Sequence, residues 1–192
     1  FNFVSSWFVY GDTDLPAKEN SYCNPKGFYS ITKRAAEQLL ISYCKTFNIK
    51  YRILRLSNVY GSSDKFSKKR NALQYLMDQL KQSKDIELYY NGDFVRDYLH
   101  VHDVSRAIKL CIQKGKVNEI YNIGSGQPIT FIDLITYMKD KFDSCSEIKS
   151  IDPPEFHNIV QVKDMYLDTS KLVDLGFKPD YTIWEGLNSI YG

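Results

Sequence analysis

The stretch Phe28-Tyr29-Ser30-Ile31-Thr32-Lys33 opens a segment whose apolar pattern predicts a helix over residues 28–47. Tyr29 and Lys33 stand four positions apart, so this helix places both side chains on one face. A free phenol ionises at about pH 10, and a neighbouring ammonium group favours the ionised form. The spacing therefore predicts that Lys33 makes Tyr29 a usable acid or base.

The pattern Tyr-x-x-x-Lys is weak on its own, because the chain contains it three times. In the copy formed by Tyr22 and Lys26, Pro25 disfavours the helix that a shared face requires. The copy formed by Tyr137 and Lys141 lies in a predicted amphipathic helix, but no strand ending in a hydroxyl residue precedes it at a comparable distance. The middle copy follows a predicted strand that ends in two serines, and this context favours it.

The composition is that of a globular protein, with 43% hydrophobic and 25% charged residues in a chain of 192. A formal net charge of +2 indicates no strongly basic surface, so we predict no nucleic-acid partner. No apolar run is long enough for a membrane span and no signal peptide opens the chain, which predicts a cytoplasmic protein without a membrane partner. The cysteines lack metal-ligand spacing, so no metal site is predicted, and they fit a reducing compartment.

The order of the predicted elements indicates an α/β fold. Residues 1–9 and 51–56 predict strands on either side of the helix, and a strand–helix–strand unit implies a parallel sheet with a right-handed crossover. Small hydroxyl residues at the carboxyl end of such a strand lie where open α/β sheets bind ligands. Further along we expect a helix over 71–82, strands over 86–90, 95–101 and 119–123, a helix with Asp103 as its N-cap, a helix opening at Thr130, a strand at 159–162 and two short helices in the tail.

Five motifs follow one another along the chain. They are Ser5-Ser6-Trp7-Phe8-Val9-Tyr10-Gly11, Tyr29-x-x-x-Lys33, Leu54-Arg55-Leu56-Ser57-Asn58-Val59-Tyr60-Gly61, Arg96-Asp97-Tyr98-Leu99-His100-Val101-x-Asp103-Val104 and Tyr121-Asn122-Ile123-Gly124-Ser125-Gly126. Together they resemble the extended short-chain dehydrogenase/reductase family, the NAD-dependent nucleotide-sugar epimerases and dehydratases. The resemblance runs from residue 1 to the end of the chain, and five motifs in this order are far more specific than any one.

The resemblance implies the C-terminal portion of a Rossmann-type parallel sheet plus a smaller α+β substrate-binding cap. We assign residues 1–65 to the NAD-binding part and residues 66–192 mainly to the cap, with some chain crossing back. Family members carry a glycine-rich phosphate-binding loop near their start, and this sequence has none. The nearest candidate, residues 124–126, lacks the third glycine. We therefore expect a C-terminal part of a longer protein that binds NAD poorly by itself.

The family also implies roles for particular residues. The catalytic residues would be Ser6, Tyr29 and Lys33. The cofactor NAD, with NADP left open, would be bound by Ser5, Tyr29, Lys33 and Leu56. A nucleotide-diphosphate sugar would be bound by Ser6, Asn58, Asn71, Leu73 and Arg96. By analogy, the helix over 28–47 would form a homodimer interface.

Three departures from the family pattern bear on the reaction. Trp7 stands where the family usually has a small residue, and it either packs or forms a wall of the sugar pocket. The dehydratase branch has Thr-Asp-Glu where this chain has Ser6-Trp7-Phe8, so an elimination would lack its general acid. A second arginine expected near His157 is missing, and this histidine either replaces it or is an ordinary loop residue.

These observations predict a nucleotide-sugar epimerase that acts at C4 through transient hydride transfer to NAD. The alternatives are a nucleotide-sugar 4-reductase or a dehydratase of the same family. A non-catalytic module that binds sugar nucleotides is the alternative from another class, and the presence of Ser6, Tyr29 and Lys33 together argues against it. The sugar, the nucleotide base and the choice between NAD and NADP stay open.

Overall fold

The computed structural model describes residues 1–61 and 72–191. Its central sheet contains three parallel strands, β1 (Asn2–Ser6), β2 (Arg52–Leu56) and β7 (Glu119–Ile123), in the order β1-β2-β7. The first strand is shorter than predicted, because the chain turns into a 3-10 helix at Trp7. The parallel pairing confirms the predicted strand–helix–strand unit and the α/β class.

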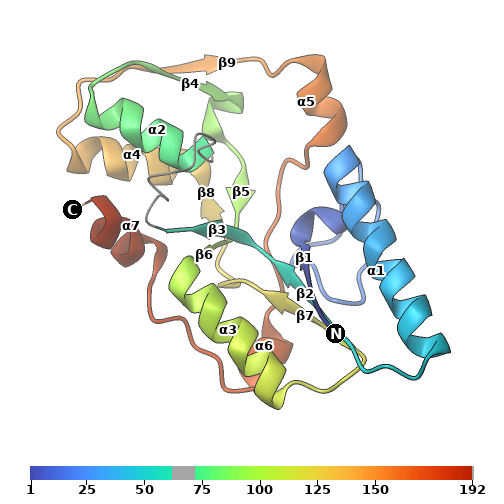
Figure 1. The fold of residues 1–192 in the computed structure, drawn as a ribbon. Coiled ribbons are helices and arrows are strands. Elements are labelled where there is room, and N and C mark those ends of the chain that lie inside the picture. Colours follow the sequence, from blue (N-terminus) through green and yellow to red (C-terminus); the bar gives the residue numbers. More distant parts are fainter. Residues whose placement is uncertain (62–71, 192) are drawn as a thin grey trace.

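Helices cover both faces of this sheet (Figure 1). Helix α1 (Phe28–Thr46) lies on one side, and α3 (Val101–Lys114) and α6 (Ser170–Asp174) lie on the other. Successive residues of β2 point to opposite faces, so Ile53 packs with Cys44 under α1 while Leu54 packs with Cys111 of α3. The helix predicted over 28–47 is confirmed to within one residue at its end.

The remaining elements form a second packed region beside the carboxyl ends of the three strands (Figure 1). Helices α2 (Ala72–Lys81) and α4 (Phe131–Lys141) pack around a core that includes Met77, Leu80 and Leu134. The elements of this region also include β3 (Asn58–Tyr60), β4 (Ile86–Tyr89), η2 (Tyr90–Gly92), β5 (Val95–Arg96), β6 (Tyr98–His100), β8 (Ile129–Thr130), β9 (Ile148–Ile151), α5 (Glu155–Val160) and α7 (Ile183–Tyr191).

The chain crosses between the two regions more than once. After α2 and β4, it returns to the sheet as α3 and β7, leaves again as α4, and returns as α6. The division at residue 65 stays a prediction, because that position lies outside the described residues. No helix in the described part of the chain is long and apolar enough to cross a membrane.

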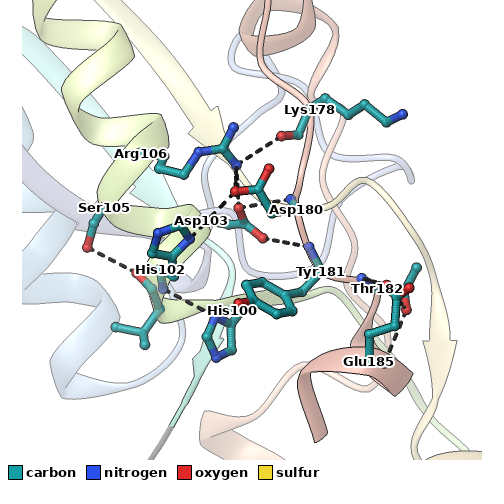
Figure 2. A network of polar contacts seen from close by, with 11 residues as sticks. His100, His102, Asp103, Ser105, Arg106, Lys178, Asp180, Tyr181, Thr182 and Glu185 are labelled. Carbon is teal, nitrogen blue, oxygen red and sulfur yellow. Dashed lines mark hydrogen bonds and ion pairs between the residues drawn. The ribbon is translucent and has the colours of Figure 1, made fainter. Parts of the chain in front are cut away.

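The prediction that Asp103 caps α3 is wrong. The N-cap is His100, whose ring Nδ1 accepts a hydrogen bond from the backbone N–H of His102. Asp103 lies one turn further on, fully buried, and accepts hydrogen bonds from the backbone N–H groups of Asp180 and Tyr181 at 3.0 and 3.1 Å (Figure 2). Its carboxylate therefore anchors the C-terminal segment to α3.

The prediction of a strand at residues 159–162 is also wrong. Residues 155–160 form the helix α5, and the chain becomes extended at Gln161. The alternation of Ile159, Val160, Gln161 and Val162 suggested a strand face. In the structure Ile159 is exposed, whereas Val162 is buried beside Trp7. Only Val162, beyond the end of α5, packs against the first region, and none of the residues of α5 itself is buried.

Candidate active site

Tyr29 and Lys33 lie on one face of the first turns of α1, as their spacing predicted. The Lys33 ammonium stands 5.9 Å from the centre of the Tyr29 ring. The same ammonium donates a hydrogen bond to the Val4 carbonyl of β1 at 2.9 Å and lies 5.1 Å from the Phe3 ring. Lys33 thus ties α1 to the edge strand and holds its charge beside the phenol. The Tyr29 side chain is 55% exposed.

Ser5 and Ser6 end β1 beside this pair, and their side chains have different surroundings. The Ser6 hydroxyl oxygen accepts a hydrogen bond from the Phe8 backbone N–H at 3.4 Å and so caps the short helix η1 (Trp7–Val9). None of the described residues accepts the Ser6 O–H proton. Ser5 pairs in register with Arg55, and its buried hydroxyl faces Glu37 without a well-formed hydrogen bond, yet close enough to help lower the pKa of that carboxyl.

Helix η1 links Tyr29 to a large cavity. The edge of the Phe8 ring faces the Tyr29 ring at 6.1 Å between centres, and the Phe8 ring stacks on Trp7 at 3.8 Å. Both Trp7 and Phe8 line a cavity of about 1020 Å³. Tyr29 therefore stands at the rim of this cavity, one aromatic ring away from its wall.

Three of the predicted substrate residues line this cavity, namely Asn58, Leu73 and Arg96. The Asn58 amide nitrogen donates one hydrogen bond to the Asp97 carbonyl at 3.0 Å and keeps a second N–H. His157 also lines the cavity, with its ring 4.6 Å from that of Tyr89. Burial, and then the charge of Arg96, lowers the pKa of His157.

Arg96 forms no ion pair with a carboxylate within residues 1–61 and 72–191, and the nearby charge of Asp164 only partly offsets the effect of burial on its pKa. Its guanidinium donates to the backbone carbonyls of Val95 and Val162 at 2.8 Å, and to that of Lys163. Neither neighbouring aspartate pairs with it, because Asp93 lies by Lys163 and Asp97 binds Ser125 and Gly126. Burial lowers the pKa of Arg96, yet the side chain stays cationic because the ordinary value is so high. Its Nε–H and one Nη2–H have no acceptor among these residues.

Some predicted site residues lie elsewhere. Asn71 falls outside the described residues. Leu56 packs on the α3 side of β2, in the cluster that contains Leu54 and Leu99. Ser5, Ser6, Tyr29, Lys33 and Leu56 do not line the cavity itself. They lie on β1, β2 and the start of α1, next to the edge of the sheet where these parallel strands end.

Sequence reasoning missed the role of Asp97, which holds the loop after β7. This buried carboxylate accepts hydrogen bonds from the N–H and hydroxyl of Ser125 at 2.8 and 2.7 Å and from the Gly126 N–H at 3.1 Å. A Cβ at Gly124 would collide with the same carboxylate, which explains the glycine. The Gly-Ser-Gly sequence thus wraps an aspartate of the chain. The adjacent Arg96-Asp97 pair in the motif was the available signal.

A buried ion pair between α1 and β2 was also missed. Glu37 accepts two hydrogen bonds from Arg55, at 3.0 Å from Nε and 2.7 Å from Nη2, and both side chains are almost fully buried. Burial alone would raise the pKa of Glu37, but the hydrogen bonds and charge of Arg55, with smaller contributions from Ser5 and Arg34, lower it overall. An arginine in the middle of an apolar strand was the signal for this pair.

Tyr10 lies beside the ion pair. The Arg55 guanidinium stands 4.7 Å from the centre of its ring, and its hydroxyl donates to Asn122 at 2.6 Å. Burial raises the pKa of Tyr10 to about 12, so this tyrosine of the first motif is structural and does not act as an acid or base.

His102, Asp103 and Asp180 have ligand-type atoms within 4.8 Å of one another. Arg106 already pairs with both carboxylates, at 2.6 Å to Asp103 and 2.9 Å to Asp180 (Figure 2). A guanidinium in this position repels a metal cation. The group is therefore explained as an ion-pair network that fastens the C-terminal segment to α3.

Comparison with known proteins identifies the family. A model of the NAD dependent epimerase/dehydratase family matches residues 1–124, which is more than half of the chain. The chain belongs to this family. The resemblance seen in the five motifs is thereby confirmed.

Several relatives match almost the whole chain. A UDP-glucose 4-epimerase of Thermotoga maritima, solved with UDP-glucose, superposes with a TM-score of 0.87 at 27% identity, over 99% of this chain and 61% of its own. The dTDP-4-dehydro-6-deoxyglucose reductase of Escherichia coli is 26% identical over 95% of this chain and 57% of its own length.

A trifunctional UDP-glucose 4,6-dehydratase/UDP-4-keto-6-deoxy-D-glucose 3,5-epimerase/UDP-4-keto-L-rhamnose-reductase of Arabidopsis thaliana is 32% identical over 96% of this chain and 28% of its own length. The chain thus spans less than two thirds of each of these relatives. The superposition on the Thermotoga enzyme confirms the Rossmann-type α/β architecture of this epimerase/dehydratase family member.

Proposed function

We propose that the full protein is an NAD-dependent nucleotide-sugar epimerase that inverts C4 of its substrate. The observation that carries this proposal is Arg96, which forms no ion pair with a carboxylate of the described residues and lies in the wall of a cavity next to Tyr29. A guanidinium with free N–H groups suits the diphosphate of a sugar nucleotide. The Thermotoga relative, a UDP-glucose 4-epimerase solved with UDP-glucose, supports the same ligand class.

The residues of this chain fit the nicotinamide end of NAD. Ser5 near the end of β1 and Ser57 just after β2 have buried hydroxyls, and that of Ser57 has no hydrogen-bond partner in the described part of the chain, so it can serve a polar ligand there. Ser5 faces Glu37, Leu56 pairs in register with Ser6 as an apolar neighbour, and Lys33 is the cation beside Tyr29. When bound, NAD supplies the hydride acceptor and donor at the sugar carbon.

The side chains around the cavity have separate roles in proton transfer and in substrate binding. Tyr29 takes the proton of the sugar 4-hydroxyl during oxidation and returns it during reduction. Lys33 holds positive charge beside the Tyr29 phenol, and Ser6 donates its free O–H to the same sugar oxygen. Arg96 and Asn58 bind the diphosphate at the other end of the ligand, with Leu73 in the same cavity wall. Asn71 is assigned to substrate binding from the family resemblance alone. Inversion requires the sugar ring to turn over while the diphosphate stays held.

A 4-reductase of the same fold is the second candidate. The reductase of Escherichia coli and the trifunctional protein of Arabidopsis, which match nearly all of this chain, favour it. The two reactions differ in their cofactor balance. An epimerase interconverts its sugars without net NADH formation, whereas a reductase consumes one NADH or NADPH for each product. The absorbance of NADH or NADPH at 340 nm separates the two reactions. A reductase lowers it in proportion to the amount of substrate converted, whereas an epimerase leaves it unchanged.

Replacing Arg96 by methionine tests the binding role. Arg96→Met is expected to weaken the binding of UDP and dTDP by about 10- to 150-fold, the loss typical of a hydrogen-bonded charged group. The measurement is isothermal titration of the full protein with each nucleotide. Lys109→Met removes an equal charge from an exposed site on α3 and is the control, with unchanged affinity expected. Equal affinity in Arg96→Met and the wild type would reject the proposed substrate site.

The proposal includes a homodimer through α1 and a cytoplasmic location without nucleic-acid or membrane partners. The outer face of α1 exposes Leu39, Tyr43 and Phe47 around an apolar groove, a surface suited to a helix of a second copy. The free cysteines Cys44 and Cys111 fit a reducing compartment. Light scattering of the full protein tests the dimer, and cell fractionation tests the location.

A further inference from the structure

A continuous row of stacked side chains connects Tyr29 with Arg96. The Tyr29 ring meets the edge of Phe8, and Phe8 stacks on Trp7 with an angle of 22° between the ring planes. The Arg96 guanidinium lies 5.4 Å from the centre of the Trp7 ring. The row therefore joins the rim of the cavity to the cation in its wall.

Two aromatic rings lie close to the guanidinium of Arg96. Phe94 lies 4.8 Å from its central carbon, next to Trp7 at 5.4 Å, and Phe94 is itself stacked on Phe131 of α4 at 4.8 Å. Both distances are within the range of attractive cation–π contacts. Trp7 comes from η1 and Phe94 from the segment before β5, so the arginine is held by both regions of the chain.

Backbone carbonyls bind Nη1 and Nη2 of Arg96. The rings of Trp7 and Phe94 add cation–π contacts to the same guanidinium. A long arginine side chain loses considerable rotamer freedom when ordered, and ordering it before the ligand arrives improves affinity. A tryptophan offers the largest and strongest aromatic face for this purpose. Trp7 is 2% exposed, so its own orientation is fixed by packing.

We propose that Trp7 is a positioning residue that holds Arg96 in the orientation that binds the diphosphate of the nucleotide sugar. This inference rests on the proposed function. It adds a residue of η1, in the region of the three-stranded sheet, to the residues that control nucleotide binding. It also assigns a functional role to Trp7, the bulky residue of the Ser-Ser-Trp-Phe motif, in addition to its role in packing. The Nε–H and one Nη2–H of Arg96 have no acceptor among the described residues and remain available to the ligand.

A double-mutant cycle on the full protein tests this role. Trp7→Leu is expected to weaken UDP and dTDP binding by about 3- to 30-fold, the range for a desolvated cation–π contact, and to raise KM with kcat changed less than about twofold. In the Arg96→Met background, the same Trp7→Leu change is expected to cost nothing further. Trp7→Phe keeps an aromatic face and should recover most of the affinity.

Trp184→Leu is the matched control. This second tryptophan packs on Tyr137 at 4.8 Å between ring centres and does not line the cavity. Its replacement should leave nucleotide affinity unchanged in both backgrounds. If Trp7→Leu does not fold, Phe94→Leu takes its place in the same cycle, with the same expected coupling to Arg96→Met.

The outcomes separate this inference from the proposed function. Coupling between position 7, or position 94, and Arg96 supports it, together with recovery by Trp7→Phe. Equal losses from the aromatic substitution with and without Arg96 would overturn it, because the aromatic ring would then act on the ligand or the fold independently of the arginine. Unchanged affinity in Trp7→Leu would overturn it as well. Unchanged affinity in Arg96→Met, or no nucleotide binding by the wild type, would reject the proposed function and this inference together.

Discussion

Tyr29→Phe is expected to lower kcat of the full protein by about 10²- to 10⁴-fold, the usual contribution of a positioned acid or base. The variant keeps the ring that packs against Phe8 and loses only the hydroxyl that exchanges a proton with the sugar. Because Arg96 and Asn58 bind the diphosphate at the other end of the cavity, KM should change by no more than a few fold. Steady-state kinetics with the nucleotide sugar gives both values.

The other copies of Tyr-x-x-x-Lys provide controls for this experiment. Tyr22→Phe removes a hydroxyl from an exposed tyrosine on the loop before α1, and Tyr137→Phe removes one from α4. Tyr137 donates a hydrogen bond to Asn188 at 2.9 Å, so its loss can affect stability but has no route to the chemistry. Both controls should turn over at the wild-type rate. A Tyr29→Phe variant that does the same would show that Tyr29 is not the acid or base.

Glu37→Gln is expected to destabilise the protein by about 3–5 kcal/mol, because it leaves the buried guanidinium of Arg55 without its counter-charge. The Glu37 carboxylate also accepts a hydrogen bond from Arg34 at 2.8 Å, so the variant weakens a second contact. The free energy of unfolding from urea titration measures the loss. The matched control is Asp85→Asn, which removes an exposed ion pair with Lys149 and should cost less than about 1 kcal/mol.

The same pair predicts part of the acid sensitivity of the fold. The pKa of Glu37 is lower in the folded than in the unfolded protein. Its stabilisation is therefore complete above the ordinary glutamate pKa and is lost as the pH falls through the lowered value. Glu37→Gln should lack this component, so the stability difference between the variant and the wild type should shrink in acid. A difference that stays constant down to strongly acidic pH would contradict the assignment of the buried charge.

The amino-acid sequence alone was enough for the local elements. Helix α1 and strands β1, β2 and β7 follow from the spacing of apolar residues along short segments of the chain, and this spacing can be seen directly in the sequence. The i and i+4 spacing placed the Lys33 charge beside Tyr29 for the same reason. It failed where a short apolar alternation at residues 159–162 matched a strand, although residues 155–160 form a helix with no buried residue. The prediction from sequence failed again at Asp103. This residue type often caps helices, but here its carboxylate accepts hydrogen bonds from the backbone N–H groups of Asp180 and Tyr181.

Only the tertiary structure decided the contacts between distant segments. Trp7 meets Arg96 across 89 positions of sequence, Arg55 meets Glu37 across 18, and Asp97 meets the loop at Ser125 across 28. In the unfolded chain each of these side chains can interact with water instead, and no local sequence pattern indicates which distant residue it will contact. The partner is selected when the helices and the sheet pack together and bury the charged or hydrogen-bonding group. Leaving such a group unpaired costs several kcal/mol, which is a large share of the net stability of a domain.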